Sequence, residues 1–192
     1  MGRLTLILGG ARSGKSTFAG QLALESGKQV AYVATARALD TEMEKRIAVH
    51  QRERPGSWTT LEIPSRLGSL RDLLPSSAQL VLVDCLTMLA TNILLDVTED
   101  VDHPDEEAAT ARMAAEIADL AALVQDSPWD WIIVSNEVGL GLVPPYPLGR
   151  IFRDLLGWAN QRLAARADEV YWLVAGIPVP IHPFRQSQIT EG

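Results

Sequence analysis

The 192-residue sequence is poor in cysteine, in basic residues and in long apolar runs, and each shortage excludes a class of protein. Its single cysteine, Cys85, has no partner for an internal disulfide, and apolar neighbours favour a buried, unreactive thiol. No stretch reaches the ~18 apolar residues of a membrane-spanning helix, and the N-terminus does not resemble a signal peptide. We therefore expect a cytoplasmic protein without a membrane span.

Basic residues are outnumbered as well. The chain has 17 Lys and Arg against 24 Asp and Glu, a net charge of −7. Nucleic acid is not expected as a partner, because phosphate backbones are bound by basic surfaces. The length allows one domain with a sizeable core, and neither repeats nor a linker interrupt it. Residues 1–192 are therefore predicted to form one domain, with a polar tail from about residue 183.

The sequence does contain a complete phosphate-binding loop of the G-x-x-x-x-G-K-[ST] type, formed by Gly9, Gly10, Ala11, Arg12, Ser13, Gly14, Lys15 and Ser16. An apolar run precedes it and a helical pattern follows, which is the context that this motif requires. Backbone N–H groups and the helix N-terminus would then bind phosphate oxygens. Lys15 is expected to reach the β- and γ-phosphates, and the Ser16 hydroxyl to bind Mg²⁺. A glycine-rich turn without ligand is the alternative, and the agreement of every fixed position argues against it.

Short apolar runs alternate with helical patterns along the rest of the chain. Strands are expected at residues 4–8, 30–34, 58–63, 80–83, 131–134 and 170–174, and helices at 15–25, 41–54, 67–74, 86–95, 106–124 and 149–167. This alternation predicts an α/β fold of three layers, with a mainly parallel sheet covered on both faces. A turn at residues 176–178 leads into a short antiparallel edge strand. The broken segment 139–147 is a candidate lid or substrate loop.

Polar residues stand at the ends of two expected strands. Asp84 follows four apolar residues, as a Walker B aspartate does, and is predicted to hold Mg²⁺ together with Ser16. Asn136 and Glu137 follow the run 131–134, at the sheet edge where α/β proteins bind ligands. They either orient a phosphate, a water or a second substrate, or they cap the strand.

Histidines are few, and composition alone gives none of them a role. His103 and His182 are expected to be solvated. His50 lies on the second helix, where an exposed surface histidine is the simpler interpretation. The nearby Arg54 weakens that interpretation slightly, because guanidinium groups match phosphate oxygens.

Taken together, the motifs resemble those of a known family. Besides the phosphate loop, the resemblance rests on Tyr32-Val33-Ala34-Thr35-Ala36, on Arg46-Ile47 with His50, Arg54-Pro55 and Trp58, on Asp84-Cys85-Leu86-Thr87 with Asn92, on Ser135-Asn136-Glu137-Val138-Gly139, and on Phe152-Arg153-Asp154 with Asn160-Gln161. From about Leu4 to Ile181 the chain resembles the bifunctional adenosylcobinamide kinase/adenosylcobinamide-phosphate guanylyltransferases of cobalamin biosynthesis.

The resemblance implies two reactions on one corrinoid substrate. ATP or GTP would phosphorylate adenosylcobinamide, and GTP would then donate GMP to adenosylcobinamide phosphate through a histidine–GMP intermediate. The matching histidine is His50; some family members have two adjacent histidines there, whereas this chain has Val49 before it. The resemblance also implies Mg²⁺, a RecA-type sheet, a homotrimer, and nucleotide contacts from Arg37, Ala38, Leu39, Arg54, Pro55, Gly56, Ser57 and Glu62.

Two other functions remain open on the motifs alone. A P-loop small-molecule kinase would need no guanylyl transfer, but the segment 139–147 offers no basic residue before Arg150 to clamp phosphates. The second of these functions is a nucleotide switch or an assembly ATPase.

The five tryptophans could fill the core or an interface. We expect the corrinoid at exposed apolar surface near residues 139–147.

Overall fold

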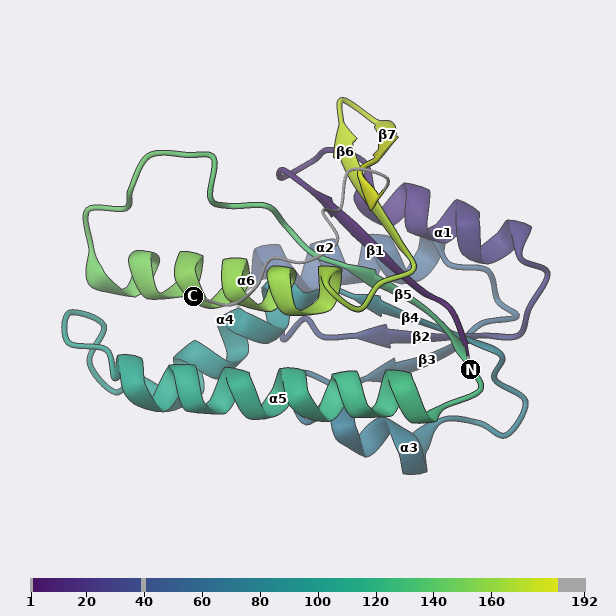
Figure 1. Ribbon diagram of the computed structural model, residues 1–192, viewed down its shortest axis with the longest axis horizontal. Coiled ribbons are helices and arrows are strands. Elements are labelled where there is room, and N and C mark those ends of the chain that lie inside the picture. Colours follow the sequence, from purple (N-terminus) through teal and green to yellow (C-terminus); the bar gives the residue numbers. More distant parts are fainter. Residues whose placement is uncertain (1, 39–40, 183–192) are drawn as a thin grey trace.

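A computed structural model describes residues 2–38 and 41–182, which form a seven-stranded sheet of order β3-β2-β4-β5-β1-β6-β7 (Figure 1). The strands are β1 (Leu4–Gly9), β2 (Val30–Ala34), β3 (Thr59–Glu62), β4 (Leu80–Asp84), β5 (Asp130–Val134), β6 (Glu169–Val174) and β7 (Ile177–Pro180). β1 to β6 pair in parallel, and β7 pairs antiparallel with β6 at the edge. The predicted mainly parallel sheet with an antiparallel edge strand is confirmed.

Helices cover both faces of this sheet. They are α1 (Lys15–Glu25), α2 (Thr41–Glu53), the 3-10 turn η1 (Leu67–Ser69), α3 (Leu70–Leu73), α4 (Leu86–Val97), α5 (Glu106–Asp126) and α6 (Pro147–Ala164). Neighbouring residues of a strand face opposite sides, so the described core divides in two. Leu8 belongs to the cluster under α4, α5 and α6, whereas Ile7 belongs to the cluster under α1. The result is the expected three-layer α/β arrangement.

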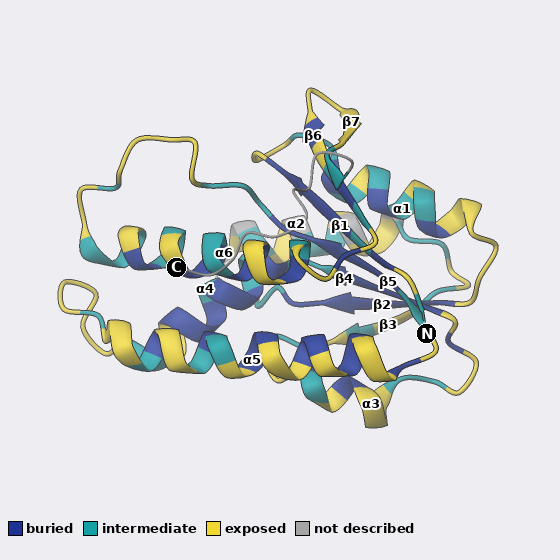
Figure 2. Cartoon of the chain, viewed as in Figure 1, coloured by how far each residue is buried: buried dark blue, intermediate teal, exposed yellow. Residues whose placement is uncertain are grey.

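Burial follows the predicted pattern (Figure 2). β2 is buried along its whole length, whereas α5 buries one stripe and exposes the other side. The tryptophans divide between environments, since Trp131 is fully buried and Trp172 is exposed on β6. Among the described residues, no helix is both long and apolar enough to cross a membrane.

Several predicted boundaries move. α6 begins at Pro147 rather than Gly149, because proline suits the first turn of a helix. The same helix ends at Ala164 rather than at residue 167. The segment 67–74 is a 3-10 turn followed by one short helix. The predicted polar tail from residue 183 lies outside the described residues.

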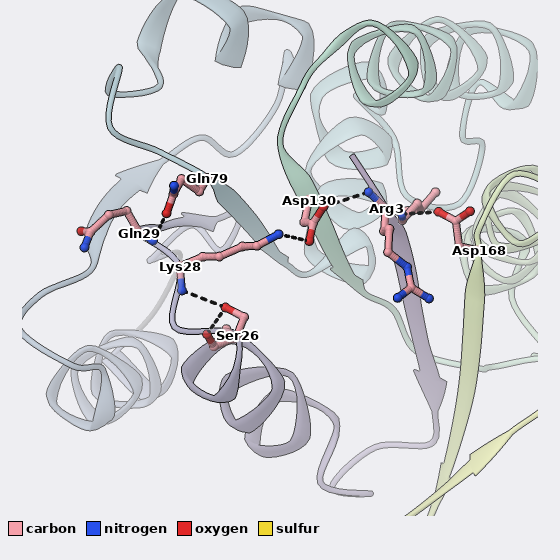
Figure 3. A network of polar contacts seen from close by, with 9 residues as sticks. Arg3, Ser26, Lys28, Gln29, Gln79, Asp130 and Asp168 are labelled. Carbon is pink, nitrogen blue, oxygen red and sulfur yellow. Dashed lines mark hydrogen bonds and ion pairs between the residues drawn. The ribbon is translucent and has the colours of Figure 1, made fainter. Parts of the chain in front are cut away.

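The amino-terminal ends of the strands are joined by a polar network (Figure 3). Asp130 accepts a hydrogen bond from the backbone N–H of Arg3 at 2.9 Å and another from the Lys28 ammonium. Asp168 accepts from the N–H of Leu4 at 2.7 Å. The amino-terminal ends of the strands are therefore fixed by structural contacts. The residues predicted to carry chemistry gather at the carboxyl-terminal ends.

Candidate active site

The phosphate loop connects β1 to α1 and depends on glycine at two positions. Gly9 has φ 154° and Gly14 has φ 92°, and the latter value is unfavourable for any residue with a side chain. A Cβ on Gly9 would stand 2.6 Å from the carbonyl oxygen of Leu173. The loop is also fixed from β7's side, because Gly176 donates its N–H to the Ser13 carbonyl at 3.0 Å. These contacts hold the backbone N–H groups in place before a ligand arrives.

Lys15 begins α1 and is buried. Its Nζ donates a hydrogen bond to the carbonyl oxygen of Gly10 at 2.7 Å, across the loop. Burial lowers the pKa of Lys15, while the nearby Cys85 and the carboxylate of Asp84 act in the opposite direction. The lysine and Asp84 are thus within electrostatic reach of each other at the carboxyl edge of the sheet.

A cavity of about 340 Å³ lies beside α1 and brings several predicted residues together. We call it the nucleotide cavity. Its lining includes Ser16, Arg54, Pro55 and Asp84. Ser16 and Asp84 are more than sixty residues apart in the sequence. Predicted metal ligands and predicted nucleotide contacts therefore share one space.

Tyr32 orients Asp84 in this cavity, a role that the sequence motifs did not indicate. The Tyr32 hydroxyl donates to Oδ2 of Asp84 at 2.8 Å, from the neighbouring strand. Burial, reinforced by the charge of Asp84, raises the pKa of Tyr32 far above its ordinary value, so the hydroxyl keeps its proton. The sequence feature that could have indicated this role is the one hydroxyl-bearing side chain in the otherwise apolar run 30–34.

Arg54 and Trp58 complete the wall around Tyr32. The Arg54 guanidinium carbon lies 3.7 Å from the centre of the Tyr32 ring, and Trp58 stacks on that ring at 6.3 Å between centroids. Nε and Nη1 of Arg54 are buried and have no hydrogen-bond partner within the described part of the chain. Arg54 therefore brings a cation with two unsatisfied nitrogens to the wall of the nucleotide cavity.

The other predicted nucleotide contacts are placed more loosely. Gly10, Ala11 and Arg12 are exposed at the tip of the phosphate loop, as are Ala38, Gly56 and Ser57 in their connections, while Glu62 ends β3 and accepts from Gln51 at 3.2 Å. Arg37 is bound to Asp96 of α4 through two hydrogen bonds of 2.5 and 2.9 Å. His50 falls within α2, but its side chain lies outside what the structure describes, as does Leu39 entirely.

The segment after β5 forms part of a further cavity of about 450 Å³, between the end of β1 and α6. The Asn136 backbone is held on both sides, since its N–H donates to Thr87 Oγ1 at 3.0 Å and its carbonyl accepts from Asn160 at 2.9 Å. The side chain of Glu137, in contrast, lines the cavity. Of the two open interpretations for this segment, strand capping fits the Asn136 backbone, and a ligand-facing position fits Glu137.

The predictions for the two other histidines and for the cysteine have different outcomes. His103 is exposed and pairs with Asp100 at 2.9 Å, as expected. The prediction for His182 is wrong: it is half-buried, with its ring 6.4 Å from that of Tyr171, because β7 folds the chain back along β6. Burial raises the pKa of Cys85 to about 11, which agrees with an unreactive thiol. Within residues 2–38 and 41–182, no three His, Cys, Asp or Glu side chains gather as a metal site.

Comparison with known proteins identifies the family. A family model described as cobinamide kinase / cobinamide phosphate guanyltransferase matches residues 5–181. The chain belongs to this family. It is a bifunctional kinase and guanylyltransferase of adenosylcobalamin biosynthesis, so nucleotides and cobinamides are its substrates.

Curated relatives match over nearly their full length. The bifunctional adenosylcobalamin biosynthesis protein CobP of Pseudomonas aeruginosa is 44% identical over 176 residues, covering 92% of this chain and 95% of the relative. The corresponding CobU of Escherichia coli is 44% identical over 183 residues, covering 93% and 99%. Among solved structures, RadB recombinase aligns with a TM-score of 0.47 at 19% identity, covering 88% of this chain and 73% of that one.

Proposed function

We propose that this chain transfers the γ-phosphoryl group of ATP or GTP to adenosylcobinamide, and then transfers GMP from GTP to the product through His50. The observation that best supports this route is the position of α2. Its last residues lead directly to Arg54 and Pro55, which line the nucleotide cavity with Ser16 and Asp84. His50 precedes Arg54 by four residues, about one helical turn, and this spacing supports a role for the histidine next to that cavity.

In the kinase step, the phosphate loop holds the triphosphate through its N–H groups, and Lys15 exchanges its bond to Gly10 for phosphate oxygens. Ser16 and Asp84 fit Mg²⁺, which is usually held by one or two protein oxygens and by substrate phosphates. When bound, Mg²⁺ would neutralise charge on those phosphates. The hydrogen bond from Tyr32 keeps the Asp84 carboxylate turned to a fixed position.

In the guanylyl step, the imidazole of His50 attacks the α-phosphorus of GTP. A P–N bond forms, the bond to the bridging oxygen breaks, and pyrophosphate leaves. A phosphate oxygen of the corrinoid then attacks the same phosphorus and releases the imidazole. With an unperturbed pKa of ~6.5, imidazole is largely neutral near pH 7 and is a competent nucleophile. Covalent transfer replaces one encounter of two polyanions by two easier displacements.

Further parts of the proposal concern binding and assembly. The unpartnered nitrogens of Arg54 suit a GTP phosphate, and the exposed turn at Gly56 and Ser57 suits the nucleoside. Arg37 would have to break its hydrogen bonds to Asp96 before it could contact the nucleotide. We also propose a homotrimer and a cytoplasmic location, with which a free cysteine is compatible.

The test is covalent labelling. The protein is incubated with Mg²⁺ and GTP labelled at the α-phosphate, denatured, and assayed for acid-labile, alkali-stable label. We expect label on the wild-type protein, none on His50→Ala, and unchanged labelling of the matched control His103→Ala, whose histidine is exposed on a loop. GTP labelled at the γ-phosphate should leave no label. A His50→Ala variant that guanylylates cobinamide phosphate at the wild-type rate would refute the role of His50.

A further inference from the structure

The cavity beside α6 is lined by polar groups to which the proposed nucleotide chemistry assigns no role. We call it the α6 cavity and define it by Glu137, Arg153, Asp154, Trp158, Asn160 and Gln161. It lies on the other face of the sheet from the nucleotide cavity. Leu8, which lines it, packs in the core cluster under α6, whereas Tyr32 of the nucleotide cavity packs in the cluster under α1.

The phosphate loop is where the α6 cavity comes closest to the nucleotide. The N–H of Glu137 donates to the carbonyl oxygen of Gly9, the first residue of the loop, at 3.0 Å. The preceding Ser135 is bonded in the same way to Ile7 at 2.9 Å. The backbone at Glu137 is therefore held directly against the first residue of the loop that would bind the γ-phosphate, and the bond from Ser135 continues this pairing along β1.

Two residues that line the α6 cavity also carry an unmatched donor and an unmatched acceptor. Nη1 of Arg153 and Oδ1 of Asn160 are buried and have no hydrogen-bond partner within the described residues. Buried polar groups are nearly always paired, so these two atoms call for a partner that the described residues do not supply. A carboxamide supplies both an acceptor and donors. Cobinamide carries carboxamide arms and one arm that ends in a hydroxyl, whereas an ordinary small kinase substrate has no such set.

We propose that the α6 cavity binds the hydroxyl-bearing arm of cobinamide, and that Glu137 accepts the proton of this hydroxyl in the kinase step. This inference rests on the proposed kinase chemistry. The hydroxyl oxygen forms a bond to the γ-phosphorus, the bond to the β–γ bridging oxygen breaks, and the nucleoside diphosphate leaves with the electron pair. The proton passes to the Glu137 carboxylate. Its Oε1 accepts the N–H of Gly139 at 2.5 Å, which leaves Oε2 as the oxygen that takes the proton.

In this proposal only the arm enters the cavity of about 450 Å³, and the corrin ring stays outside it. The chain leaves the cavity at Gly139 and continues into a loop with exposed apolar side chains. Leu140, Leu142 and Tyr146 are 77%, 96% and 61% exposed. Such a patch suits the apolar edge of a corrin. The exposed apolar surface predicted for this loop is present, and corrinoid binding there stays a prediction.

The role of Glu137 has a consequence that separates the two reactions. In guanylyl transfer the acceptor is a phosphate that is already ionised, so no proton has to be removed. Glu137→Gln should therefore lower kcat of the kinase step about 100-fold or more. GTP binding, labelling of His50 and guanylylation of cobinamide phosphate made by the wild-type protein should stay within about twofold. Glu99→Gln, on an exposed loop, is the matched control.

Three outcomes overturn or support the assignment of Glu137. A kinase rate of Glu137→Gln within twofold of wild type overturns it, as does an equal loss of both activities. Selective loss of the kinase step supports it. Failure of His50 labelling in a protein that still shows this selective loss would reject the guanylyl mechanism while leaving the present inference intact.

Binding of the arm is tested by Arg153→Met, with cobinamide affinity measured by equilibrium dialysis in the absence of nucleotide. We expect Kd to rise at least about tenfold, because a charged donor is lost from a buried site. Arg166→Met, on an exposed part of the chain just after the same helix, is the control. If Arg153→Met does not fold, Gln161→Ala at the exposed rim takes its place. An unchanged Kd in the folded variant overturns the site.

Discussion

At the scale of single residues, the pair formed by Tyr32 and Asp84 sets the geometry of the nucleotide cavity. A carboxylate at a strand end can rotate, and the hydroxyl of Tyr32 fixes it at 2.8 Å. Because burial keeps this hydroxyl protonated, it donates throughout the physiological pH range. Arg54 on the same ring adds positive charge within the cavity. The hydroxyl is therefore a positioning group for the Asp84 carboxylate.

Tyr32→Phe removes this hydrogen bond while keeping the ring under Arg54. We expect the Mg²⁺ concentration needed for half-maximal kinase rate to rise about tenfold, as for loss of a charge-assisted hydrogen bond, with little change in Tm. The measurement is a Mg²⁺ titration of the initial rate. Tyr146→Phe, at an exposed loop position, is the control. An unaltered titration curve would show that Tyr32 does not act on the metal site.

Residue by residue, the sequence predicted the phosphate loop and Asp84 because their patterns depend on local backbone needs. It assigned Arg37 to the nucleotide without foreseeing Asp96, a partner fifty-nine residues away that arrives on α4. It expected His182 to be solvated, because the return of β7 along β6 is a tertiary contact. Tyr32 was missed for the same reason, since its partner lies on a neighbouring strand.

At the scale of elements, α5 is joined to the start of η1 by a buried carboxyl group. Glu116 is 4% exposed, and its Oε1 accepts the backbone N–H of Leu67. Burial raises the pKa of Glu116 above its ordinary value, although the N–H of Leu67 opposes this. A raised folded-state pKa favours the protonated form. The stability it contributes is complete below the ordinary pKa and is lost as pH rises through the folded value.

Glu116→Gln keeps an oxygen acceptor and removes this titration. We expect the free energy of unfolding of the wild type to fall, relative to the variant, by up to about 1.4 kcal/mol per pH unit just above the ordinary pKa. Urea unfolding at a series of pH values from 4 to 7 measures the difference. Glu107→Gln, exposed on the same helix, should run parallel to wild type. Parallel curves for Glu116→Gln would contradict the pKa argument.

Elements whose sequence patterns are long and regular were predicted well. The helix 106–124 and the strand 80–83 differ from α5 and β4 by two residues or fewer. Boundaries shifted where the chain ends a helix without a strong signal, as at Ala164, where the next residue, Ala165, forms the cap without a glycine or proline. The strand order could not be predicted, because it depends on how crossovers pack and not on any local pattern.

At the scale of the whole molecule, the β6–β7 edge leaves apolar side chains exposed. Trp172, Val174 and Ile177 are 36%, 47% and 65% exposed. Edge strands with such surfaces tend to be covered by another chain. In the proposed homotrimer, this edge would lie at a subunit contact, and the position of Gly176 would place that contact next to the phosphate loop.

Light scattering coupled to size-exclusion chromatography tests the assembly. We expect a mass of three times the 20.9 kDa chain. Ile177→Asp should shift that mass toward the single chain, because a charge cannot be buried unpaired without a large cost. Leu24→Asp, which changes an exposed leucine of α1, is the control. A wild-type protein that elutes with the mass of one chain would reject the trimer.

The placement of the α6 cavity and the nucleotide cavity on opposite faces of one sheet has a kinetic consequence. With the proposed occupants, neither substrate of the phosphorylation blocks the entrance of the other, so a ternary complex forms in either order. The second reaction passes through an enzyme-bound GMP and releases pyrophosphate before the acceptor reacts, which is a ping-pong sequence. A single phosphate loop, reached by one substrate from each face of the sheet, would then serve a sequential and a ping-pong reaction.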